Sequence, residues 1–188
     1  MRVACVATKG FEDHELADPV EALRDAGHQV DVIAPHEDEI AGYHGEVKVT
    51  PQLAIDDASP EEYDALFVPG GYSPDQLRAD NRFIRFVRAF EEKPIFAICH
   101  GPQLLFTAGL LDEKRVTAWR TVQFDLESAG LDVVDEAVVE DGLLITSRQP
   151  SDLPQFCQAI VRCLSHLPEP EASEPSIGTE EREGEELR

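Results

Sequence analysis

Short apolar runs alternate with segments of helical periodicity along most of the sequence. The apolar runs have the length and β-branched content of strands buried on both faces, and they occupy residues 2–7, 29–35, 64–68 and 94–99. The helical segments occupy residues 15–26, 75–90 (in two pieces), 102–111, 121–129 and 152–167. This order of strand and helix predicts a mostly parallel sheet that is covered by helices on both faces.

Two segments interrupt the alternation. Residues 40–50 combine alternating apolar residues with two glycines, which predicts a small hairpin. Residues 115–119 predict a short strand, and residues 133–148 predict two strands around an Asp-Gly turn. We therefore expect one folded domain over residues 1–167.

The last residues, 168–188, differ in composition from everything before them. They contain eight Glu and two Arg but almost no residues that form a core. Such a composition predicts a disordered acidic tail, with a docking element as the alternative.

Charge limits the partners of the protein. Asp and Glu number 38 against 16 Lys and Arg, for a formal net charge of −22. This charge opposes binding to nucleic acid and to anionic membrane surfaces, which both require clustered cations. It favours a halophilic protein in a cytoplasm of high salt, where screening reduces self-repulsion; an ordinary acidic protein is the alternative.

The cysteines indicate a reducing compartment. Cys5, Cys99, Cys157 and Cys163 show neither C-x-x-C spacing nor the density of a disulfide scaffold. The first residues lack the pattern of a signal peptide, so we expect a cytoplasmic protein. No metal-ligand spacing is present, and we expect neither a metal nor a cofactor.

Cys99 stands where the run of residues 94–99 ends and the next helix begins. Sites of open α/β sheets form beyond the carboxyl ends of the strands, and the positive end of a helix favours a thiolate. A corner of this kind also tends to strain the residue and expose it, as the nucleophile elbow of hydrolases does. The adjacent His100 can act as a base, which favours a reactive thiol over a merely packed one. Cys5, Cys157 and Cys163 are expected to be packing residues.

Two further strand ends carry candidate groups. Gly70 and Gly71 follow the third strand, and the N–H groups of Gly71 and His100 could form an oxyanion hole. After the first strand comes an acidic cluster from which Glu15 could point toward Cys99 and exchange a proton with it. The alternative for this cluster is a solvated surface.

Five motifs occur in one order along the chain, and two of them, AICHGPQLL and VPGGYSPDQLR, are specific. The set comprises GFEDHEL (10–16), LRDAGHQV (23–30), ALFVPGGYSPDQLR (65–78), AICHGPQLL (97–105) and DGLLITSRQPSDLP (141–154). From residue 2 to about residue 164 the chain resembles the PfpI intracellular protease family of the ThiJ/PfpI superfamily, which has class I glutamine-amidotransferase-like folds.

The resemblance implies a flavodoxin-like three-layer sandwich in which Cys99 is the nucleophile and His100 lies beside it. Glu15 matches the carboxylate that contacts the thiol in this family, and Glu12 is its neighbour. Asp75 falls where some members supply an acidic partner to the histidine from an adjacent subunit. This implies a homo-oligomer, a dimer or a hexamer, with its site near a subunit interface.

One departure concerns the size of the pocket. TAWRT (117–121) replaces the more usual TSYPG-like turn, so Trp119 is expected to narrow the site.

The resemblance further implies an enzyme, a hydrolase or lyase with a cysteine nucleophile and a protective role in stress. The preferred substrates are small α-oxoaldehydes or glycation adducts, in a glyoxalase or deglycase reaction. Peptide hydrolysis is the alternative activity. A protein of another class, a redox or stress sensor that acts through oxidation of Cys99, is the alternative to an enzyme.

Overall fold

The computed structural model describes residues 1–167. Its centre is a seven-stranded sheet of order β10-β11-β7-β6-β1-β2-β5, in which every neighbouring pair is parallel except β10 and β11. The strands are β1 (Arg2–Val6), β2 (Gln29–Ala34), β5 (Leu53–Ala54), β6 (Ala65–Val68), β7 (Ile95–Ile98), β10 (Val138–Asp141) and β11 (Leu144–Ser147). The mostly parallel sheet predicted from the sequence is confirmed.

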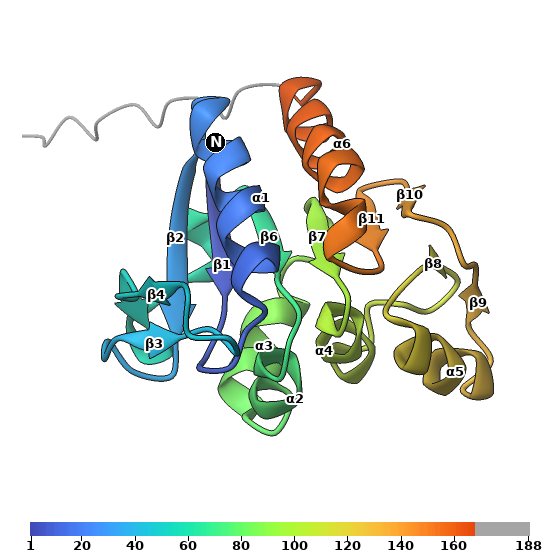
Figure 1. The fold of residues 1–188 in the computed structure, drawn as a ribbon, viewed down its shortest axis with the longest axis horizontal. Helices are drawn as coiled ribbons and strands as arrows, with labels where there is room; N and C mark the ends of the chain where they lie inside the picture. The colour runs from blue at the N-terminus through green and yellow to red at the C-terminus, as the bar shows by residue number, and fades with distance from the viewer. Residues whose placement is uncertain (168–188) are drawn as a thin grey trace, which may run out of the picture.

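Helices cover both faces of the sheet (Figure 1). One face carries α1 (Asp13–Asp25) and α6 (Leu153–Ser165), which pack against each other. The other face carries α2 (Ser73–Leu77), α3 (Asn81–Arg88), α4 (Gly101–Ala108) and α5 (Arg120–Ser128). Short 3-10 helices span Ile55–Asp57, Pro60–Glu62 and Pro150–Asp152.

Strand β1 shows how the sequence separates the two cores. Successive side chains of a strand point to opposite faces of the sheet. Val3 and Cys5 accordingly enter the core beneath α1 and α6, whereas Ala4 and Val6 enter the core beneath α3 and α4. Both faces are apolar, so β1 is apolar from Val3 to Val6, as expected of a central parallel strand.

Two small sheets lie outside the main one. The predicted hairpin is confirmed as β3 (Ile40–Ala41) paired antiparallel with β4 (Lys48–Val49). The extent of the strands predicted at residues 115–119 and 133–148 is wrong in part. Only Arg115–Val116 forms β8, which pairs with β9 (Asp132–Val133), and β10 starts five residues later than expected. The physical reason is that Asp135, between β9 and β10, is bound by Arg148 instead of entering a ladder.

No helix within residues 1–167 combines the length and the apolar character that crossing a membrane requires. The acidic tail predicted for residues 168–188 lies outside the described residues.

Candidate active site

The candidate site lies where the carboxyl ends of three neighbouring strands meet. The segments that follow β1, β6 and β7 bring Glu15, Gly71 and Cys99 to one cavity of about 390 Å³. The cavity is lined by Glu12, Glu15, Tyr43, Gly71, Tyr72, Cys99, His100, Trp119 and Pro150. A cavity of about 440 Å³ at the amino ends of β7 and β11 has neither cysteine nor histidine in its lining, so it offers no comparable chemistry.

Cys99 occupies the corner between β7 and α4 in a left-handed backbone conformation, with φ of 62°. A non-glycine residue in this region is strained unless its surroundings hold it there. They do so through both backbone groups: the Cys99 N–H donates to the Ser147 carbonyl at 3.0 Å, and the Cys99 carbonyl accepts from the Trp119 N–H at 2.9 Å. The corner therefore has the strained geometry expected of it and lines the cavity, but the expected exposure is wrong, because Cys99 is buried.

His100 lies directly beside the sulfur. Its Nδ1 is 3.3 Å from Cys99 Sγ, and its ring stacks on Trp119 with centroids 6.4 Å apart. Burial lowers the pKa of His100, and the negative charge of Asp75 opposes this only partly. A neutral imidazole at pH 7 can accept a proton from the thiol.

Glu15 is fully buried on α1. Within residues 1–167 neither of its carboxylate oxygens has a hydrogen-bond partner of good geometry. Burial raises the pKa of Glu15 to about 8, even though the Cys99 thiol and the Gly70 N–H lie close enough to lower it. A carboxyl group with a pKa near neutrality, next to a nucleophile, can give and take protons during a reaction.

The pKa of Cys99 is also raised, by burial first and then by the charge of Glu15. The N–H groups of Gly71 and His100 act in the opposite direction, and for His100 this is the effect expected of the start of a helix. Burial outweighs them, so the net shift of the Cys99 pKa is upward, although the helix start acts in the expected direction. The thiol must instead lose its proton to a neighbouring base during reaction.

Gly70 and Gly71 have no side chains, which lets Glu15 and Cys99 lie close together. A Cβ on Gly70 would collide with Glu15 Oε2 and would lie 2.6 Å from Cys99 Cβ. Gly71 has φ of 77°, and its N–H points toward the sulfur together with that of His100. Two backbone donors on one side of a nucleophile are suited to a developing oxyanion.

The structure gives Glu12 a structural contact as well as a place in the cavity wall. It caps α1 by accepting hydrogen bonds from the N–H groups of His14 at 2.9 Å and Glu15 at 3.1 Å. The cap fixes the first turn of α1 and thereby the position of Glu15.

Asp75 lies apart from the other candidates. On α2 its side chain is 69% exposed, with Arg78 at 4.0 Å, and within residues 1–167 it makes no hydrogen bond to His100. Its charge acts on His100 only from a distance. One copy of the chain therefore does not bring Asp75 into contact with the site.

A model described as the DJ-1/PfpI family matches residues 1–163. The chain belongs to the DJ-1/PfpI family. It is 47% identical over 159 residues to General stress protein 18 of Bacillus subtilis, covering 82% of this chain and 92% of that protein. It is 44% identical over 167 residues to Protein/nucleic acid deglycase 2 of Escherichia coli, covering 87% of this chain and 97% of the relative.

Solved structures of the family share the fold. The DJ-1/ThiJ/PfpI-like part of a two-domain protein from Anabaena variabilis matches with a TM-score of 0.84 and 36% identity, covering 87% of this chain and 48% of that one. Oxidized Toxoplasma gondii DJ-1 matches with a TM-score of 0.79 and 23% identity, covering 87% of this chain and 90% of that one. The flavodoxin-like fold expected from the motifs is thus confirmed.

Three residues of the cavity wall are not among the predicted site residues: Tyr43, Tyr72 and Pro150, of which only Tyr43 lies outside the five motifs. Tyr43 and Tyr72 form an edge-to-face pair with centroids 5.3 Å apart, although 29 positions separate them. Each of the two tyrosines lies next to a glycine in a turn, which is a weak signal by itself. Their meeting depends on the hairpin folding over the end of β6, which local patterns do not predict.

The other cysteines lie away from this site. All four cysteines are free; Cys5 is fully buried in β1, and burial raises the pKa values of Cys157 and Cys163 on α6. Residues 1–167 contain no group of three or more His, Cys, Asp or Glu side chains arranged to hold a metal ion.

Proposed function

We propose that the protein is a stress-protective enzyme that uses Cys99 to convert small α-oxoaldehydes or glycation adducts. The observation that carries the proposal is the buried carboxyl of Glu15, unpartnered within residues 1–167 and adjacent to the Cys99 sulfur. The names of the two curated relatives, a general stress protein and a deglycase, support the same role.

The first step on an α-oxoaldehyde is addition of sulfur to the aldehyde carbon. His100 accepts the thiol proton through Nδ1 while the sulfur forms its new bond. The N–H groups of Gly71 and His100 stabilise the negative oxygen, which then takes up a proton to give a hemithioacetal.

The second step moves a proton between adjacent carbons. Glu15, as a carboxylate, removes the proton from the former aldehyde carbon and returns it to the neighbouring carbon. The hydroxyl proton moves from the first oxygen to the second in the same step, which yields a thioester on Cys99. Water then cleaves the thioester, releasing an α-hydroxy acid and restoring the thiol. The sum is the addition of one water molecule, with no external oxidant or reductant.

A peptidase would use the same sulfur to form an acyl-enzyme, with His100 protonating the leaving amine. We favour small carbonyls because the cavity is only about 390 Å³ and has Tyr43, Tyr72 and Trp119 in its wall. A redox sensor is the second candidate, since a protonated Glu15 and the two N–H groups would also hold an oxidised sulfur.

Paired assays in high salt test these roles. Lactate formation from methylglyoxal should fall at least about 1,000-fold in Cys99→Ser and remain unchanged in Cys157→Ser, the half-buried control. Equal lactate formation by wild type and Cys99→Ser would overturn the proposal. Cys99-dependent cleavage of casein would favour the peptidase, and selective oxidation of Cys99 by mild peroxide, without turnover, would favour the sensor.

We further propose a homo-oligomer, a dimer or a hexamer, in which Asp75 reaches His100 of a neighbouring copy. The Asp75 side chain is exposed on α2, which would allow it to contact a neighbouring copy. Sedimentation should show a dimer or hexamer, and a monomer with full activity would argue against it.

We also propose a cytoplasm of high salt as the working environment, given four free cysteines and a net charge of −22. Stability to urea should rise with added salt; no rise would contradict this proposal.

A further inference from the structure

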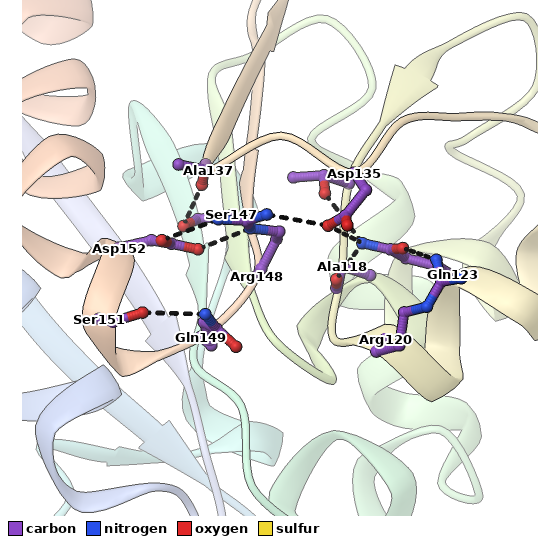
Figure 2. A network of polar contacts seen from close by, with 11 residues as sticks. Ala118, Arg120, Gln123, Asp135, Ala137, Ser147, Arg148, Gln149, Ser151 and Asp152 are labelled. Carbon is purple, nitrogen blue, oxygen red and sulfur yellow. Dashed lines mark hydrogen bonds and ion pairs between the residues drawn. The ribbon is translucent and has the colours of Figure 1, made fainter.

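Two walls of the cavity are joined by polar contacts outside it (Figure 2). One wall is the segment 117–119, which carries Trp119, and the other is the segment 147–150, which carries Pro150. Asp135, in the connection between β9 and β10, lies between the two groups of side chains. No residue of this network except Trp119 and Pro150 lines the cavity itself.

Gln123 holds the Trp119 wall. It is almost fully buried on α5. Its side-chain amide donates to the Ala118 carbonyl at 2.9 Å, and its backbone N–H donates to the Trp119 carbonyl at 2.9 Å. The same amide group also reaches Asp135 Oδ1 at 3.3 Å.

Arg148 holds the Pro150 wall. Its guanidinium group donates to the carboxylate of Asp152 at 2.9 and 3.2 Å, and this pair spans the turn that contains Pro150. A planar guanidinium bound by two nitrogens to one carboxylate has little freedom to rotate. Its third contact, from Nη1, is to Asp135 Oδ1 at 2.9 Å.

Asp135 Oδ1 therefore accepts from both walls at once. On the inner side the same two walls are tied to the nucleophile, because Trp119 donates to the Cys99 carbonyl and Ser147 accepts from the Cys99 N–H. The walls are thus connected at two levels, through Cys99 beneath the cavity and through Asp135 beside it.

We propose that Asp135 is a positioning residue that, through Gln123 and Arg148, fixes the width of the cavity above Cys99 and so restricts it to small carbonyl substrates. This inference rests on the proposed function for its substrates. Asp135 does not touch the substrate. Its side chain is 59% exposed, so its ion pair is expected to contribute little to stability, and its geometric role is the larger one.

The first test compares substrates of different size. In Asp135→Ala, the ratio of kcat/KM for phenylglyoxal to that for methylglyoxal should increase about threefold to tenfold over wild type. Asp135→Asn keeps an acceptor oxygen and should restore most of the wild-type ratio. Asp132→Ala removes a similarly exposed carboxylate, paired with Arg115 on β8, and should leave the ratio unchanged. An unchanged ratio in Asp135→Ala would overturn the inference.

The second test needs no turnover. Trp119 is the only tryptophan in the chain, so its fluorescence reports one wall of the cavity directly. Acrylamide should quench it more strongly in Asp135→Ala than in wild type or Asp132→Ala, at equal melting temperature. Identical quenching in all three proteins would refute the positioning role. Increased quenching in a protein that converts no α-oxoaldehyde would support that role while rejecting the proposed function.

Discussion

Two carboxyl groups on helix α1, Asp13 and Glu15, are both fully buried and stand two positions apart, yet their surroundings are opposite. Asp13 points to the turn of the β3–β4 hairpin, where it accepts hydrogen bonds from the N–H groups of His44 at 2.8 Å and Val47 at 2.7 Å. Glu15 points to the cavity beside Cys99, and within residues 1–167 neither of its oxygens has a hydrogen bond of good geometry.

The supply of donors decides what burial does to each group. Burial alone raises the pKa of Asp13, but the N–H groups of Val47, His44 and Glu46 outweigh it and bring this pKa below its ordinary value. For Glu15 burial dominates, and the pKa rises to about 8. Asp13, with its lowered pKa, favours the anion and anchors a loop, whereas Glu15 can change its protonation state near neutral pH.

The largest effect is expected from Glu15→Gln. Loss of the carboxyl group next to the sulfur should lower kcat/KM for methylglyoxal about 100-fold to 10,000-fold. Stability at pH 7 should not fall and should rise by about 3 kcal/mol, because wild-type Glu15 must take up a proton on folding at this pH and a glutamine need not. Kinetics and urea unfolding on the same preparation measure both. Near-normal turnover by Glu15→Gln would show that the Glu15 carboxyl group takes no part in the reaction.

Asp13→Ala should show the reverse pattern. Two buried N–H groups of the hairpin turn would lose their acceptor, which should reduce the free energy of unfolding by about 2 to 4 kcal/mol. Activity at a temperature where the variant is folded should fall less than in Glu15→Gln, since Asp13 does not line the cavity. A fully stable Asp13→Ala would contradict the anchoring role.

Each carboxyl group has a glycine against it, which provides a matched pair of variants. A Cβ on Gly42 would overlap the Asp13 carboxylate, and one on Gly70 would overlap Glu15 Oε2. We expect Gly42→Ala to reduce stability by about 1 to 3 kcal/mol with limited loss of kcat. Gly70→Ala should reduce kcat about tenfold or more, because a small displacement of reacting groups is costly. Equal reductions of kcat in the two variants would contradict the proposed difference in role between Asp13 and Glu15.

The smallest expected effect is the dependence of stability and activity on pH. The folded state binds the Glu15 proton more tightly than the unfolded state, because the pKa of a glutamate side chain in the unfolded chain is only about 4.3. The stabilising contribution is therefore complete below that value and is lost as pH rises toward about 8. Activity should move the other way, rising through about pH 8 as the carboxylate forms. Both trends should vanish in Glu15→Gln, and their persistence would assign them to another group.

Much of the fold follows from local patterns. The apolar runs predict the four central strands, Gly27 locates the end of α1, and Asp80-Asn81 locates the break between α2 and α3. The rule that sites form beyond strand ends is sufficient to predict that Cys99, Gly71 and Glu15 meet at one edge of the sheet.

The difference between Asp13 and Glu15 is not predictable in this way. In the sequence both belong to one acidic cluster, and only contacts with residues more than 30 positions away separate them. The net direction of the Cys99 pKa shift is not predictable for a related reason: helix geometry is local, whereas burial depends on how several segments meet over the sulfur.

The left-handed backbone of Cys99 limits which atoms can ever serve as nucleophile at this corner. Threonine, with two heavy atoms on Cβ, would be forced into an unfavourable conformation there, so the secondary alcohol is barred as a replacement. Serine fits, but it offers a smaller and less polarizable atom. Among natural side chains that attack carbonyls directly, this corner thus favours those that are unbranched at Cβ, and sulfur is the softest nucleophilic atom that they offer.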